Sequence, residues 1–296
     1  MSDFGAAPRL DWTLQGTPFE AASHKWGLPL LPHLYEFFSQ AAHLPSFEAC
    51  MDRLLLQKRG SLDRHWVKRM GQKTDVCLHS RLTNLASETD PDEGLITKLH
   101  ECISETSPKW VAFAVGFSSH HGHALQVPFP VPRTQEMVEL LSRRVRQLRS
   151  ALGCEIALTN VASMFRYSFD SLSETEFWLR LSEMSGAKIF FDIPAYFVTL
   201  QHQGLHFESE LGKFPLGQVM SVRIGALALS NHGDIDAECG SLSLTHWALL
   251  EDVLHALPEG ERKSIFLKWF EPLVSAQDLV GEILNGQSTL KRLGEI

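Results

Sequence analysis

Polar side chains stand at the ends of apolar runs in this sequence, where they could act together. The run Lys188–Ala195 contains one carboxylate, Asp192, among four apolar residues, and Pro194 follows shortly after it. Unbroken apolar runs of this length are typical of parallel strands that are covered on both faces. Because an isolated carboxylate there is costly, we expect Asp192 to have a charged partner or to cap the segment that follows.

Other predicted strands also end on polar residues. Their ends carry His79, Asn160, Arg223 and Lys268, and a polar loop after the seventh strand carries Asp236 and Glu238. If these strands run parallel in one barrel, their ends meet on one face and bring charges of both signs into one cavity. Such a set fits acid–base catalysis by Lys268 opposite a carboxylate, or a salt-bridged cluster without turnover.

The elements that must position these residues alternate along the chain. Apolar patterns predict strands over residues 26–30, 75–79, 110–117, 155–160, 188–195, 219–227 and 264–270, whereas 47–56 fits either a strand or a helix. Helices are predicted over residues 34–42, 62–70, 134–152, 244–257 and 276–284. Two more helices are expected, one capped by Asp90 and one opened by a capping box of Ser173 and Glu176.

Roughly eight strand–helix repeats indicate an α/β fold. We predict a single-domain (β/α)8 barrel of the TIM type over residues 24–296, preceded by an N-terminal arm over residues 1–23. The alternative is an open doubly wound sheet. No glycine-rich nucleotide-binding motif follows any predicted strand, so that alternative lacks its usual support.

Composition excludes several classes of function. A net charge of −8 argues against nucleic acid as a partner. No apolar run is long enough to span a bilayer and no signal-peptide pattern opens the chain, so we expect a cytoplasmic protein without a membrane partner. The five cysteines never show Cys-x-x-Cys spacing, which argues against a disulfide framework or a zinc ribbon. The basic cluster of Arg143, Arg144, Arg146 and Arg149 is expected on the solvated face of its helix.

The order of several short segments carries a resemblance to a known family. These segments are Val76-Cys-Leu-His79, Leu158-Thr-Asn160, Phe191-Asp192, Val222-Arg-Ile-Gly225, Asp236-Ala-Glu238 ahead of Trp247, and Leu267-Lys-Trp269. Over about residues 24–290 the chain resembles the multinuclear non-haem iron-dependent oxidases, which include the enzyme that forms oxazolone and thioamide groups in methanobactin. The resemblance implies a barrel with two or three irons at its strand ends. It also implies oxidation of a cysteine-containing ribosomal peptide, in natural-product peptide modification, with a peptide-recruiting partner protein.

The resemblance also implies which positions would hold the metals. His79, Asp192 and Asp236 match family ligands, and Asn160 matches the Asn of a Glu-Asn pair. The remaining ligand positions carry other residues: Ala112-Phe113-Ala114 replaces Ser-Glu-His, Thr159 a Glu, Arg223 a His, Glu238 a His and Lys268 a Glu. Because a guanidinium offers no lone pair to a metal, we expect Arg223 and Lys268 to replace the metals as counter-charges. This predicts a non-catalytic relative that binds a peptide or protein and needs no cofactor.

An alternative keeps the chemistry with a reduced or relocated iron site. In that case His120, His121 and His123 would join His79, Asp192, Asp236 or Glu238 around a metal ion. The competing interpretation of the three neighbouring histidines is a solvated polar loop. The counter-charge hypothesis itself predicts that Asp192→Ala is strongly destabilising and that joint apolar replacement of Asp192 and Arg223 is milder.

Overall fold

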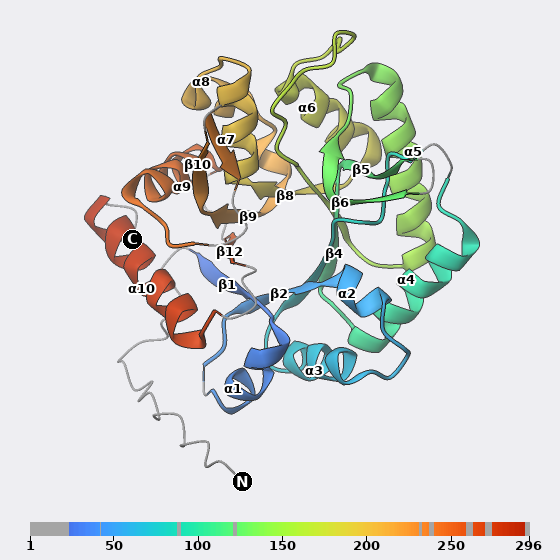
Figure 1. Cartoon of the computed structure of the whole chain (residues 1–296), viewed down its shortest axis with the longest axis vertical. Helices are drawn as coiled ribbons and strands as arrows, with labels where there is room; N and C mark the ends of the chain where they lie inside the picture. Colours follow the sequence, from blue (N-terminus) through green and yellow to red (C-terminus); the bar gives the residue numbers. More distant parts are fainter. Residues whose placement is uncertain are drawn as a thin grey trace.

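The structure is a computed structural model, which describes residues 24–41, 43–87, 90–120, 123–230, 233–236, 240–258, 263–269 and 274–293. Eight parallel strands close into a barrel in the order β1-β12-β9-β8-β7-β4-β3-β2, as Figure 1 shows end-on. The barrel strands are β1 Lys25–Pro29, β2 Ser46–Cys50, β3 Val76–Ser80, β4 Trp110–Ala114, β7 Ile156–Thr159, β8 Lys188–Asp192, β9 Val219–Gly225 and β12 Ser264–Lys268. The predicted TIM-type barrel is therefore confirmed. Residues 1–23, the expected N-terminal arm, lie outside the described part.

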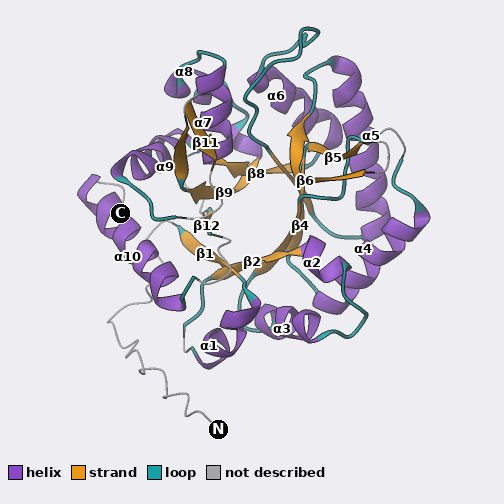
Figure 2. Ribbon diagram, in the orientation of Figure 1, coloured by secondary structure: helices purple, strands orange, loops and turns teal. Residues whose placement is uncertain are grey.

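Helices surround the barrel, as Figure 2 shows. They are α1 Tyr35–Gln40, α2 Met51–Leu55, α3 Leu62–Gly71, α4 Glu93–Thr106, α5 Gln135–Leu152, α6 Glu174–Ser185, α7 Ile193–His202, α8 Phe207–Leu211, α9 Leu244–Ala256 and α10 Ala276–Leu293, with short 3-10 turns at Pro32–Leu34 and Leu216–Gln218. The ambiguous segment 47–56 contains both kinds of element, because β2 passes directly into α2.

Capping residues fix where the helices begin and end. The predicted capping box is present, because Ser173 accepts from the backbone N–H of Glu176 and its own N–H donates to the Glu176 carboxylate. The predicted cap at Asp90 is wrong. Asp92 takes that role, since its Oδ1 accepts from the Leu95 N–H at 2.6 Å and α4 starts one residue later.

Asp90 instead pairs with Arg144, whose Nε lies 2.8 Å from Asp90 Oδ1. Arg144 is only 1% exposed and also donates to the carbonyls of Leu85 and Ser87. The expectation of a fully solvated basic face on α5 is therefore wrong at this position. The guanidinium holds the loop after β3 in place, because it satisfies carbonyls that face the buried side of the helix.

Two antiparallel hairpins extend the barrel beyond the carboxyl ends of its strands. β5 Gly116–His120 pairs with β6 His123–Pro130 after β4, and β10 Leu227–Ser230 pairs with β11 Gly233–Asp236 after β9. The strand predicted over 110–117 thus divides at Val115, and residues 123–130 form the second strand of a hairpin. Both insertions lie on the face where barrel enzymes carry their chemistry.

Candidate functional site

Strand periodicity decides which side chains point into the barrel. Alternate residues of a strand face the same side, so each inward polar residue stands two positions after another inward residue. The pairs are Cys77 and His79 on β3, Phe190 and Asp192 on β8, Ser221 and Arg223 on β9, and Phe266 and Lys268 on β12. The barrel interior therefore has a largely apolar lower layer and a polar upper layer.

Aromatic rings form much of the lower layer. The ring centroid of Phe190 lies 5.1 Å from that of Trp110 and 5.4 Å from that of Phe266, both in edge-on geometry. The guanidinium carbon of Arg223 lies 4.5 Å above the centre of the Phe190 ring. A cation over an aromatic face is favourable, and more so where water is excluded. The polar layer thus rests on the apolar lower layer.

Arg223 is the centre of the polar layer. Its Nη1 donates to Asp192 Oδ2 at 3.1 Å, and its Nη2 contacts Glu48 Oε1 and lies 2.9 Å from His79 Nδ1. Lys268 Nζ lies 3.3 Å from Asp192 Oδ2. Two carboxylates and two permanent cations are therefore buried together, and their formal charges compensate. Each of these side chains is at most 7% exposed.

The pKa shifts follow from this arrangement. Burial opposes ionisation of Asp192, but Lys268 and Arg223 outweigh it and hold the pKa below its usual value. Burial likewise opposes ionisation of Glu48, and Arg223 with His79 brings that pKa below its usual value. Burial, followed by the nearby Arg223 charge, lowers the pKa of His79. At neutral pH both carboxylates of the layer are therefore ionised beside the Arg223 guanidinium, and the imidazole is neutral.

Asp192 has two roles at once. Its Oδ1 accepts from the Ala195 N–H at 3.1 Å and caps α7, while its Oδ2 meets the two cations. The side chain of Asn160 donates to the Asp192 carbonyl and accepts from the Asp192 N–H, both at 2.8 Å. Asn160 therefore fixes the end of β8 through its backbone. Both expectations for Asp192, a charged partner and a cap, are found together.

Glu48 is the site residue that the sequence did not reveal. It is 2% exposed and contacts both Arg223 and His79. Its segment fits a strand or a helix, and in a helix Glu48 would have faced no other strand end. The signal in the sequence was the apolar pair that flanks Glu48, Phe47 and Ala49. In a strand, this pair indicates a buried segment.

Several predicted site residues are not brought into this cluster by the described structure. His123 lies on β6 and is exposed. Asp236 lies on β11 and His120 on β5, but only their backbones are described. His121 and Glu238 lie outside the described residues.

A cavity of about 400 Å³ opens above the polar layer. Its floor contains His79, Thr159, Asn160, Asp192, Arg223 and Lys268. Its walls are mainly apolar and come from β6 and from the loop after β7. The buried atoms His79 Nε2 and Thr159 Oγ1 make no hydrogen bond within the described residues. A smaller cavity of about 210 Å³ lies on the β1–β2 side and shares His79 and Arg81 with the first.

The described donors do not fit a multinuclear metal centre. No group of three or more His, Cys, Asp or Glu side chains is arranged to hold a metal within the described ranges. The three nearest candidates, Glu48, His79 and Asp192, all converge on Arg223 instead. A guanidinium has no lone pair and occupies the space between them.

Fold and site together define a TIM-type barrel with a charged centre at the carboxyl ends of its strands and an apolar-walled cavity above it. The chain belongs to the RiPP precursor modification enzyme MbnB/TglH/ChrH family, whose model matches residues 25–291. RiPPs are ribosomally made peptides that are modified after translation. The resemblance seen in the sequence is thereby confirmed at the level of the family.

Curated relatives agree with this assignment. The chain is 23% identical to a UPF0276 protein of Anaeromyxobacter sp. (strain Fw109-5) over 73% of this chain and 75% of that protein. It is 26% identical to a UPF0276 protein of Neisseria gonorrhoeae over 68% of this chain and 72% of that protein.

Among solved structures, a xylose isomerase domain protein from Alicyclobacillus acidocaldarius matches with a TM-score of 0.56 and 15% identity, covering 92% of this chain and 98% of that one. Endonuclease IV from Thermus thermophilus matches with a TM-score of 0.56 and 12% identity, covering 90% and 99%. At these identities the two structures establish the barrel fold alone.

None of the described helices is long and apolar enough to cross a membrane.

Proposed function

We propose that this protein binds a ribosomally made precursor peptide in the cavity above its charged centre. The family description names such peptides as what its members modify. The observation that carries the proposal is the cavity itself, about 400 Å³ with apolar walls over a polar floor. Ligand sites typically combine apolar walls with a few placed polar groups. A partner protein that recruits the peptide, as the resemblance implies, belongs to the same proposal.

The ion-pair geometry favours binding without metal chemistry. Arg223 lies between Glu48, His79 and Asp192, where a metal would need their lone pairs. The charges there already compensate, so the cluster does not require a divalent ion to neutralise its carboxylates. On this ground the protein would be a non-catalytic, peptide-binding member of its family.

The second candidate is metal-dependent modification of a cysteine-containing peptide. The family match favours this candidate over a non-catalytic role, because the description is that of an enzyme family. The Nε2 atom of His79 is a further observation in its favour, because it is buried without a hydrogen bond among the described residues, and an imidazole nitrogen can bind a metal. Additional ligands would have to come from Asp236, Glu238 or the histidines near the tip of the β5–β6 hairpin.

Two measurements on the full chain test these proposals. Peptides selected from a phage-displayed random library are labelled with fluorescein, and their binding is measured by anisotropy. Ala162→Trp fills the cavity wall and should abolish binding, whereas Leu179→Trp, on the outside of α6, should leave it unchanged. If no selected peptide binds, or if both variants bind as the parent does, peptide binding in this cavity is refuted.

Elemental analysis of protein expressed with excess iron, and purified without oxygen or chelator, separates the two candidates. Traces of iron or zinc below about a tenth of an equivalent would favour the non-catalytic role. Stoichiometric metal, with a mass change in an added cysteine-containing peptide, would establish modification and overturn the assignment of Arg223 as the replacing counter-charge.

A further inference from the structure

The outer wall of the cavity exposes several apolar side chains on two segments. Val127 and Phe129 on β6 are 53% and 47% exposed, and Met164 and Phe165 in the loop after β7 are 58% and 40% exposed. All four line the cavity. Phe169, farther along the same loop, is 62% exposed. We call these five residues the apolar rim. Exposed apolar residues that gather into one patch often mark a binding surface, whereas single exposed apolar residues are common.

The rim continues outward as a row of rings. The ring centroids of Phe165 and Tyr167 lie 5.2 Å apart, and those of Tyr167 and Phe169 lie 5.3 Å apart. Tyr167 also joins the two walls, since its hydroxyl donates to the Pro130 carbonyl on β6 at 2.9 Å. The loop and the hairpin are therefore connected, and apolar residues of both line the same cavity.

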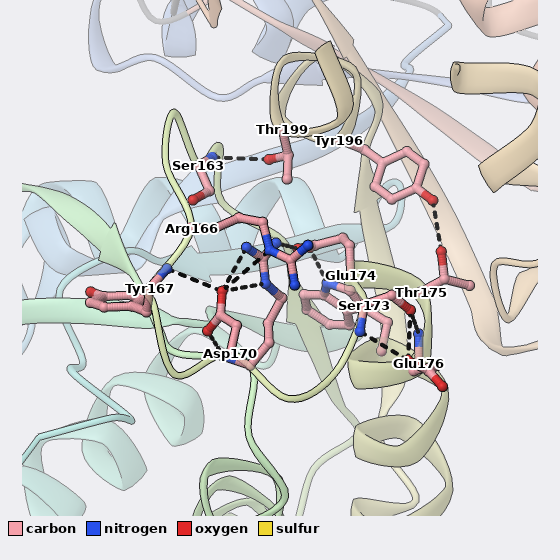
Figure 3. Close-up of polar contacts among 12 residues, drawn as sticks. Ser163, Arg166, Tyr167, Asp170, Ser173, Glu174, Thr175, Glu176, Tyr196 and Thr199 are labelled. Atoms are coloured by element: carbon pink, nitrogen blue, oxygen red, sulfur yellow. Dashed lines mark hydrogen bonds and ion pairs between the residues drawn. The ribbon is translucent and has the colours of Figure 1, made fainter. Parts of the chain in front are cut away.

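A buried ion cluster holds this loop in place, as Figure 3 shows. The side chain of Asp170 is 0% exposed; its Oδ2 lies 3.0 Å from Arg133 Nη2 and accepts from the Tyr167 N–H at 3.2 Å. Asp170 Oδ1 accepts from the Arg133 N–H at 2.7 Å, and Arg133 also contacts Glu174 at the start of α6.

The other end of the loop is tied as well, because the Ser163 N–H donates to Thr199 Oγ1 on α7 at 2.9 Å. The loop thus has fixed points at both ends while its apolar side chains stay at the surface. A surface that is held in shape before binding loses less conformational entropy when a ligand arrives.

Backbone pairing to the open edge of β6 is disfavoured. Pro128 and Pro130 have no N–H to donate, and the Pro130 carbonyl is already used by Tyr167. An incoming peptide would therefore be recognised through its side chains. Val127 and Phe129 are two residues apart on β6 and both line the cavity. Residues at this separation in an extended strand lie about 7 Å apart. An extended peptide repeats its side chains at the same spacing.

We propose that the apolar rim selects precursor peptides that carry apolar or aromatic side chains at alternate positions beside the segment that enters the cavity. This inference rests on the proposed function, because it assigns the peptide class for the same site. The rim presents apolar side chains from two segments, and the cluster of Asp192, Arg223 and Lys268 lies on the cavity floor below it. A hydrophobic flank on the rim would therefore position a polar or thiol-bearing residue over the floor.

The test uses the library-selected, fluorescein-labelled peptides on the full chain. Peptides selected by the parent should be enriched in alternating apolar or aromatic residues. Phe165→Ser and Phe129→Ser should each weaken their binding about tenfold, a loss of about 1.4 kcal/mol. Leu179→Ser is the matched control, since Leu179 is also 40% exposed but lies on α6, away from the cavity. It should bind as the parent does.

Four outcomes would overturn the inference. Two of them refute the rim and leave peptide binding intact. In the first, the selected peptides show no apolar enrichment. In the second, the rim variants bind like the parent while Ala162→Trp abolishes binding. Absence of any bound peptide refutes both. Self-association of the parent in sedimentation velocity that Phe165→Ser abolishes, with peptide affinity unchanged, would assign the rim to a second copy of the chain. Circular dichroism melts of each variant exclude unfolding as the cause.

Discussion

Replacing Asp192 by asparagine separates its charge from its capping role. Asparagine keeps an oxygen that can accept from the Ala195 N–H, but it removes the negative charge that faces Arg223 and Lys268. Arg223 retains Glu48, so the principal loss is the carboxylate that lies 3.3 Å from Lys268 Nζ. Breaking a buried ion pair by removing one partner costs about 3–5 kcal/mol. We expect Asp192→Asn to lower the free energy of unfolding by about 3 kcal/mol.

The double variant decides whether this loss is electrostatic. Asp192→Asn combined with Lys268→Met removes one charge of each sign and leaves the pair of Glu48 and Arg223. Its free energy of unfolding should be about 1–2 kcal/mol higher than that of Asp192→Asn, because the effects of two substitutions in direct contact are not additive. This pair is a cleaner choice than joint replacement of Asp192 and Arg223, since loss of Arg223 would strand Glu48.

Urea unfolding at pH 7, followed by tryptophan fluorescence, measures each free energy by linear extrapolation. The free energy of unfolding of Asp192→Ala should be about 1 kcal/mol lower than that of Asp192→Asn, because alanine also removes the cap of α7. If Asp192→Asn unfolds within about 0.5 kcal/mol of the parent, or if the double variant is no better than the single one, the counter-charge account of the cluster is refuted.

Three further predictions follow from burial, packing and charge. Burial and Arg223 lower the pKa of His79 in the folded protein, so the unfolded chain binds the proton more readily. The contribution of the neutral imidazole to the free energy of unfolding should be fully present above the unfolded pKa of about 6.5 and decline as the pH falls below it. His79→Gln should reduce that slope in urea titrations from about pH 7 to 5. A Cβ at Gly286 would lie 2.4 Å from the Trp247 ring, so Gly286→Ala should cost about 1–3 kcal/mol, whereas Gly281→Ala in the same helix, with nothing within 4 Å, should be neutral or stabilising in thermal melts. Arg133→Gln should cost about 3 kcal/mol in urea unfolding, because Glu174 loses its cation and Asp170 keeps only Arg166, at 3.9 Å. Arg180→Gln on the exposed face of α6 should cost under about 0.5 kcal/mol.

The barrel could be predicted from the sequence because its strands are short apolar runs between well-marked helices. Gly153 and Gly186 both adopt left-handed conformations at helix ends, as the helix stop signals indicate. The hairpin over β5 and β6 could not be predicted, since two prolines and several polar residues mask its alternation. Its strands are stabilised by tertiary contacts, which local propensity does not encode.

The charged centre was predicted in part for a similar reason. Asp192, Arg223 and Lys268 end strands that have clear apolar patterns, so their convergence follows from the barrel alone. Glu48 stands in a strand that passes into a helix without a break, and the pattern there has no single period. Its place in the cluster depends on the closure of β2 onto β1 and β3, which is a property of the whole chain.

Closure of the barrel explains why one arginine can serve two carboxylates from distant strands. Arg223 stands on β9, while Glu48 lies 175 residues earlier on β2, and the two meet only because the ring brings these strands together across the barrel interior. A guanidinium is long and planar enough to contact both sides at once, whereas a lysine would reach one. Arg223→Lys should therefore keep the net charge and still weaken the layer, because Glu48 and Asp192 cannot both retain a direct donor. If that variant unfolds at the parental urea midpoint, charge alone holds the centre and the planar geometry of the guanidinium is not required.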